Sequence, residues 1–189
     1  VYEWKNKEKI VYSKEIKGVS LNKGMNELKI PISAPEAKLW SVDDPNLYVC
    51  EVELSEGKNW VDKDSRRFGF RWFEASGIGE DAVFRLNGKR IMLRSAISWS
   101  FWPVNGIFPS EELAERQIRI AKELGLNMLN FHRFIGNTDV MNYADELGLL
   151  YFEEPGGFRL DVRQPFMNAV LHEKVVRMVK RDRSHPCLV

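Results

Sequence analysis

The chain has 189 residues, which fits one large domain or two small ones and excludes a complete multi-domain enzyme. Hydrophobic residues make up 44% of the sequence and charged residues 29%, a globular composition that excludes a disordered chain. Lys and Arg number 28 against 27 Asp and Glu, without a clustered basic run, so we expect no nucleic-acid partner.

The first part of the chain has a hydrophobic period of two, which is typical of β-strands. Apolar residues occupy alternate positions over 28–32 and over 48–54, and further strands are expected at 10–12 and 68–72. Turn-forming residues separate these segments. Short strands at this spacing predict an immunoglobulin-like β-sandwich over residues 1–73.

The pattern changes after residue 73. The small, glycine-containing stretch 75–79 is the natural hinge, so we expect a second domain over residues 74–189. Just beyond this stretch, Asn87 and Gly88 separate two apolar runs. Both residues tolerate a positive φ, which predicts a two-residue β-hairpin at this point.

Strands and helices alternate in the second part of the chain, because the hydrophobic period becomes helical from Ser110 onward. This order is typical of right-handed βαβ units on a parallel sheet. Four strands cannot close an eight-stranded barrel, and periodicity leaves open whether they form a small open sheet or half of a (β/α)8 barrel. The expected strands are 91–97, 128–134, 149–153 and 187–189, and the expected helices are 110–124, 138–147 and 167–183.

Chemistry is expected where these strands end, because parallel α/β folds bind ligands at the carboxyl ends of their strands. Trp99, Phe101 and Trp102 follow the first strand. Their flat rings suit stacking on the C–H face of a sugar; alternatively they anchor a loop against the neighbouring domain. Glu153 and Glu154 end the third strand on opposite sides of it, so they are not an acid/base pair.

Two histidines have different expected roles. His132 and Arg133 end the second strand, where they could hold a carboxylate or a hydroxyl; alternatively His132 is a satisfied structural residue. His185 precedes Pro186 after a basic helix, and we expect it to cap that helix end.

Cofactor and metal motifs are absent from the sequence. It has no Gly-rich phosphate loop, no His-Glu-x-x-His motif and no Gly-x-Ser-x-Gly elbow, and Cys50 and Cys187 lie far apart. We therefore expect no cofactor and no metal. The apolar stretches are also far shorter than the roughly 20 residues that cross a bilayer, so we expect no membrane partner.

Several motifs follow one another along nearly the whole chain: 39–41 (Leu-Trp-Ser), 44–48 (Asp-Pro-Asn-Leu-Tyr), 67–71 (Arg-Phe-Gly-Phe-Arg), 84–94 (Phe-x-Leu-Asn-Gly-Lys-x-Ile-x-Leu-Arg), 127–129 (Asn-Met-Leu), 143–149 (Tyr-Ala-Asp-Glu-Leu-Gly-Leu) and 181–186 (Arg-Asp-Arg-Ser-His-Pro). In this order they resemble the middle of glycoside hydrolase family 2, which includes β-galactosidases, β-glucuronidases and β-mannosidases. The resemblance implies an immunoglobulin-like sandwich followed by the first half of a catalytic (β/α)8 TIM barrel.

The resemblance also implies a mechanism. In this family an Asn-Glu pair at the end of the fourth barrel strand supplies the general acid/base, and a later Glu is the nucleophile. Both would fall after Val189, so we expect no catalytic residue in this chain. The implied reaction is retaining hydrolysis by two carboxyl groups about 5 to 5.5 Å apart.

Residue by residue, the resemblance implies a set of substrate-binding side chains. Ser95, Ala96 and Ile97 stand where Gly, Val and a sugar-facing Asn are usual, and either His132 or Arg133 takes the position of the family's His before Tyr-Pro. Glu154 matches the Glu of an Asp-Glu-Ala-Asn segment. The expected substrate-binding set is Arg94, Trp99, His132, Arg133 and Glu154.

We therefore expect a fragment of a retaining exo-β-glycosidase, β-galactosidase-like, with carbohydrate as its substrate and no activity of its own. The alternative is a degenerate barrel that only binds carbohydrate or acts as a scaffold, because several usual sugar contacts are replaced. An open half barrel exposes edge strands, so self-association is possible. A polysaccharide-degrading parent would favour a periplasmic or extracellular location, which the sequence itself leaves open.

Overall fold

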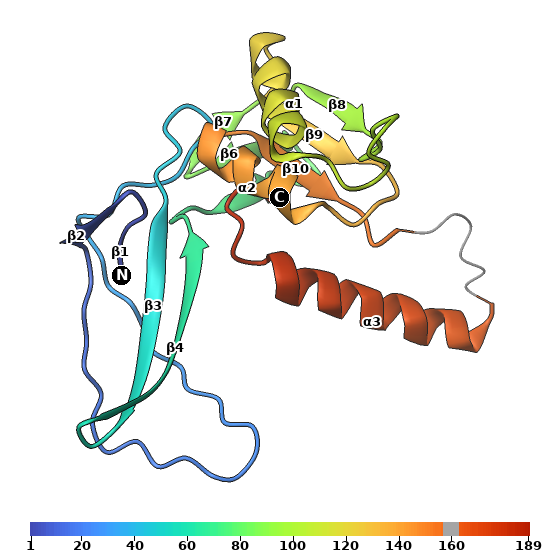
Figure 1. Ribbon diagram of the computed structural model, residues 1–189. Helices are drawn as coiled ribbons and strands as arrows, with labels where there is room; N and C mark the ends of the chain where they lie inside the picture. Colours follow the sequence, from blue (N-terminus) through green and yellow to red (C-terminus); the bar gives the residue numbers. More distant parts are fainter. Residues whose placement is uncertain (157–162) are drawn as a thin grey trace.

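The computed structural model describes residues 1–156 and 163–189 (Figure 1). An antiparallel β region comes first, followed by a parallel β-α-β-α-β segment, so the chain combines β and α/β structure. Within the described residues, no helix has the length and apolar character needed to span a membrane.

The first sheet is antiparallel and has the strand order β2-β1-β3-β4. Its two long strands, β3 and β4, form a hairpin that extends away from the helices and the parallel sheet (Figure 1). The turn of this hairpin contains Gly57 with a φ of 61°. The strands are β1 (Tyr2–Glu3), β2 (Asn6–Ile10), β3 (Tyr48–Glu56) and β4 (Asn59–Phe68).

The expected strand at 28–32 is wrong, because this segment has no hydrogen-bonded partner strand. Leu28 is 57% exposed, and Pro31 has no N–H to give to a ladder. Alternation in a sequence selects one face of a strand, but it does not supply the neighbouring strand. The first sheet therefore consists of four strands in the described residues, without a strand at 28–32.

Two other strand predictions in this part are displaced. The strand expected at 10–12 ends at Ile10, since the next two N–H groups both bond to the carbonyl of Val1. The strand expected at 68–72 begins much earlier, at Asn59, and ends at Phe68. The chain leaves the sheet at Gly69, which packs so closely against Trp40 and Pro186 that a Cβ would lie 2.8 Å from the Cβ of Trp40.

A second, small antiparallel sheet contains β5 (Phe73–Ser76), β6 (Val83–Leu86) and β7 (Lys89–Ile91). The hairpin predicted at Asn87 and Gly88 is confirmed, with φ values of 53° and 76°. The stretch 75–79 lies at the end of β5 and in the loop that follows it. The division at residue 73 stays a prediction.

The parallel sheet has the order β10-β9-β8 and confirms the predicted βαβ units. Its strands are β8 (Ser95–Ser98), β9 (Met128–Phe131) and β10 (Leu150–Glu153). They are shorter than expected, since β8 begins four residues later than predicted and β9 ends three residues earlier. The fourth expected strand is present as one parallel bridge between Tyr151 and Leu188. The helices are α1 (Glu111–Glu123), α2 (Thr138–Leu147) and α3 (Pro165–Asp182).

Capping residues lie at the helix boundaries. Ser110 accepts a hydrogen bond from the N–H of Leu113, and Asn137 accepts one from Asp139. Gly148 ends α2 with a φ of 76°. The helices α1 and α2 cover one face of the parallel sheet, whereas α3 extends away from it (Figure 1).

The buried carboxylate of Asp145, on α2, joins the first sheet to the parallel sheet region. Its Oδ2 lies 2.6 Å from Nδ1 of His185 and 3.8 Å from a guanidinium nitrogen of Arg67 on β4. Its Oδ1 accepts a hydrogen bond of 3.0 Å from the N–H of Cys187. The imidazole of His185, which we expected to cap α3, therefore binds a carboxylate on another helix instead.

Gly148, at the end of α2, offers a test of its close packing against the backbone of Val42. A Cβ at this position would collide with the carbonyl oxygen of Val42, whereas a Cβ on Gly125, at φ +78°, would meet nothing within 4 Å. Gly125→Ala should cost about 1–2 kcal/mol from its backbone conformation alone. Gly148→Ala should cost about 1–3 kcal/mol more, because it adds a collision. Urea unfolding of both variants measures the difference, and equal losses would contradict the tight contact.

Asp145→Ala should lower the free energy of unfolding by about 3–5 kcal/mol, because it leaves the buried partners of the carboxylate unpaired. Asp44→Ala is the control, since this exposed carboxylate makes no hydrogen bond or ion pair in the described part of the chain; we expect a change within about 0.5 kcal/mol. Chemical denaturation measures both. A loss at Asp145 no larger than at Asp44 would show that the junction does not depend on this carboxylate.

Candidate substrate site at the end of the parallel sheet

The register of the parallel sheet places three residues in one row across its uncovered face. Asn130 on β9 lies between Ile97 on β8 and Phe152 on β10. Ile97 is 56% exposed and Phe152 44%, whereas the opposite face, with Phe131 and Tyr151, is fully buried against the helices. Within the described residues, this face of the sheet is exposed, whereas the opposite face packs against the helices.

Trp99, His132 and Glu154 lie two residues beyond the members of this row, at the carboxyl ends of the same strands. The ring centroids of Trp99 and His132 are 4.7 Å apart, in an edge-to-face arrangement with an interplanar angle of 78°. Nδ1 of His132 is 3.9 Å from a carboxylate oxygen of Glu154. We call these three residues the edge cluster.

The edge cluster combines an exposed aromatic face with polar groups that can hydrogen bond. Trp99 is 60% exposed, and the side chains of His132 and Glu154 are 23% and 31% exposed. A pyranose ring has an apolar C–H face and a rim of hydroxyl groups, so it matches this combination. The three strand ends therefore form a surface suited to a sugar.

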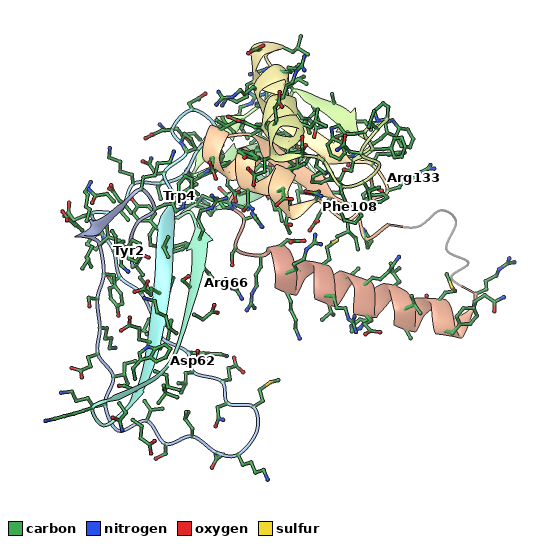
Figure 2. All side chains as sticks on the ribbon, viewed as in Figure 1. Tyr2, Trp4, Asp62, Arg66, Phe108 and Arg133 are labelled. Atoms are coloured by element: carbon green, nitrogen blue, oxygen red, sulfur yellow. The ribbon has the colours of Figure 1, made fainter. Side chains whose placement is uncertain are left out.

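Arg133 and Arg94 lie outside the edge cluster. Arg133 follows His132 with a φ of 56°, and its side chain extends outward from the loop in Figure 2. Arg94 precedes β8, at the amino end of the sheet, where its Nε donates to the carbonyl of Gly125 at 2.6 Å. The resemblance implied that Arg94 binds substrate; because β8 begins only at Ser95, Arg94 lies at the opposite end of the strand from Trp99.

The aromatic residues after β8 divide between the two roles that the sequence left open. Trp102 is partly buried, packs against the core and pairs with Gly106, so it anchors the loop. Phe101 and Phe108, 64% and 74% exposed, lie on the surface with Trp99 (Figure 2 labels Phe108). Residues 95–110 form the longest stretch of the sequence without a charged side chain. The loop therefore presents an uncharged, aromatic surface beside the edge cluster.

The two carboxylates at the end of β10 are separated, as the sequence predicts. Oε2 of Glu153 accepts a hydrogen bond of 3.0 Å from the N–H of Gly136, whereas Glu154 faces His132. Burial raises the pKa of the Glu153 carboxyl above its ordinary value, and nearby Asp182 adds to the rise, although Gly136 and Arg181 act in the opposite direction. Glu153 is therefore part of the supporting structure and not of the edge cluster.

Backbone strain and unpaired polar atoms gather at this end of the sheet. Ser100 and Arg133 have positive φ values of 49° and 56°, and the remaining non-glycine residue of this kind in the described chain belongs to the hairpin turn at Asn87. The Oγ of Ser100 and the Oδ1 of Asn130 are the buried side-chain atoms without a hydrogen-bond partner in the described residues. Such features concentrate at functional sites.

The sequence reasoning missed Asn130. A signal was present, because Asn130 lies two residues before His132, and a period of two puts both side chains on one face of the strand. Its lack of a partner is visible only once the sheet is packed.

A second group of side chains, Asp145, His185 and Cys187, combines three residue types that can bind a metal. Its ligand atoms lie within 4.8 Å of one another. Asp145 already accepts hydrogen bonds from His185 and from the backbone of Cys187, and burial raises the pKa of the Cys187 thiol. These contacts fit the structural junction described above.

Glu153→Gln tests the burial of this carboxyl. The folded chain holds its proton more tightly than the unfolded chain, so the free energy of unfolding decreases as the pH rises from the ordinary value of 4.5 through the raised folded pKa. The variant lacks this ionisation, and we expect it to gain stability relative to the unmodified chain as the pH rises through that window. Urea unfolding from about pH 4 to about pH 7 measures the difference.

Glu74→Gln, an exposed change on β5, serves as the control and should show no such dependence. A Glu153→Gln difference that stays constant across the pH range would contradict the assigned environment.

Known proteins resemble this chain along most of its length. A family model described as Glycosyl hydrolases family 2 matches residues 1–71. A β-galactosidase of Thermoanaerobacterium thermosulfurigenes is 31% identical over 155 residues, 82% of this chain and 21% of the relative. A putative β-glucuronidase of Formosa agariphila is 28% identical over 152 residues, 80% of this chain and 18% of the relative.

A solved structure of a similar protein also resembles this chain. The β-glucuronidase of Parabacteroides merdae, with glycerol in its active site, superimposes on 100% of this chain and 23% of its own, with a TM-score of 0.76 and 27% identity. This chain spans about a fifth of the length of the curated relatives it matches. The ordered motifs, the paired β and α/β regions and these matches agree, and the chain belongs to glycoside hydrolase family 2.

Proposed function

We propose that the protein containing this chain is a retaining exo-β-glycosidase and that this chain supplies part of the wall of its sugar pocket. In this proposal residues 1–73 belong to an immunoglobulin-like sandwich, and residues 74–189 are the first half of a (β/α)8 barrel. The catalytic acid/base and the nucleophile lie on other parts of the protein. The chain itself contributes substrate binding.

The edge cluster carries this proposal. An aromatic ring, an imidazole and a carboxylate meet at the carboxyl ends of three parallel strands, which is where barrel enzymes bind their substrates. Trp99 can stack on a sugar ring, and Glu154 and His132 can accept and donate hydrogen bonds to its hydroxyls. Relatives named β-galactosidase and β-glucuronidase support hydrolysis of a terminal β-linked sugar.

In this chain, the role that we propose for Glu154 is substrate binding and not catalysis. Glu153, the other carboxylate at this strand end, accepts a hydrogen bond from Gly136 on the other side of the strand, so it is not the second carboxylate of a retaining pair with Glu154. The Nδ1 of His132 lies 3.9 Å from Glu154, which leaves room for a hydroxyl group to join the two side chains.

Glu154→Gln in the protein that contains this chain should lower kcat/KM for 4-nitrophenyl β-glycosides by about 10- to 100-fold, because a charge-assisted hydrogen bond to a sugar hydroxyl is lost. Glu80→Gln, in an exposed loop after β5, is the matched control and should leave kcat/KM unchanged. Steady-state kinetics on a panel of β-glycosides measures both.

Equal kinetics for Glu154→Gln and the control would remove the edge cluster from the sugar pocket. A protein that binds sugars through this cluster but hydrolyses none of the panel would support the alternative of a non-catalytic carbohydrate-binding protein.

A further inference from the structure

We propose that Asn130 is a further sugar-binding residue and that it selects a neutral terminal sugar over a uronic acid. This inference rests on the proposed function, because it takes the edge cluster as the place where the sugar binds. It names a residue and a substrate class that the family relationship leaves open. The argument begins with the position of Asn130 and continues with its missing hydrogen bonds.

Asn130 forms the floor beneath the edge cluster. It lies on the uncovered face of β9, two residues before His132, and its neighbours in the row are Ile97 and Phe152. Both neighbours are apolar and exposed on this face. A ligand that stacks on Trp99 and touches His132 would therefore meet one polar group below it, the amide of Asn130.

This amide is unsatisfied. Its Oδ1 is buried without a hydrogen-bond partner, and within the described residues its side chain makes no hydrogen bond. Nearly all buried polar groups in folded proteins are paired, and an unpaired amide between two apolar side chains destabilises the strand that carries it. A sugar hydroxyl can both donate and accept, so it would satisfy the amide directly.

The charges around the floor favour a neutral ligand. The row of Ile97, Asn130 and Phe152 has no cation, so a carboxylate resting on it would lose water without gaining a counter-charge. Glu154, in the row above, would repel a second carboxylate. The next cation along the strand, Arg133, extends outward from the loop (Figure 2).

The test compares Asn130→Leu with the unmodified protein, in the full-length protein that contains this chain. Leu branches at Cγ as Asn does, although it is larger, and it lies here between two apolar and exposed side chains, so the strand should keep its structure. We expect kcat/KM for 4-nitrophenyl β-galactoside and β-glucoside to fall at least ~10-fold, because a hydrogen bond to the substrate is lost. We expect Tm to stay constant or to rise by about 2–4 °C, because an unpaired buried amide is removed.

Two comparisons complete the design. Asn59→Leu, on the exposed β3–β4 hairpin, is the matched control and should leave kcat/KM unchanged. The unmodified protein should prefer both neutral glycosides to 4-nitrophenyl β-glucuronide by at least ~10-fold. If sugars bind without turnover, the affinities for galactose and glucuronate, measured by calorimetry, replace kcat/KM in each comparison.

The outcomes separate this inference from the proposed function. Unchanged kinetics for Asn130→Leu, or a preference for the glucuronide, would overturn the inference while the proposed function stands. Neither turnover nor binding of any sugar would overturn the proposed function and the inference together. Reduced activity of Asn130→Leu with an unchanged or higher Tm would support the role of Asn130, since replacement of a purely structural residue would lower both the activity and the Tm.

Discussion

One buried carboxylate, that of Asp145, joins the antiparallel region to the parallel region. Asp145 on α2 binds His185, the backbone of Cys187 and Arg67 at once. Arg67 lies on β4 of the first sheet, whereas the other two partners follow α3. Its carbonyl group accepts the indole N–H of the fully buried Trp40 at 2.8 Å. A charge removed from water is destabilising unless such partners surround it, so these contacts stabilise the observed arrangement of the antiparallel and parallel regions.

The local features of the fold were predictable because their causes are local. The helices α1 and α2, the hairpin at Asn87 and Gly88, and the parallel order of the strands follow from period, caps and positive-φ residues. The strand expected at 28–32 fails for the opposite reason, since a strand needs a partner that its own sequence does not provide. The polar residues of β4 gave no apolar alternation, because most of them are exposed on the hairpin.

The candidate site was partly predictable on the same grounds. Strand ends brought Trp99, His132 and Glu154 together, as expected from the rule for parallel sheets. Arg94 lies outside the site because residues 92–94 belong neither to β7 nor to β8. Since β8 begins at Ser95, Arg94 precedes this strand, whereas Trp99 follows it. The contact between Asp145 and His185 spans 40 positions in the sequence and has no local signature.

The two-residue repeat of β9 has a consequence for how this family member can vary. Loss or gain of one amino acid in that strand before Asn130 would turn Asn130 and His132 toward the helices and bring the ring of Phe131 out to water. The same change in the loop after His132 would leave both orientations intact. Natural variants of this region should therefore differ in loop length while the distance between these side chains along the chain stays even.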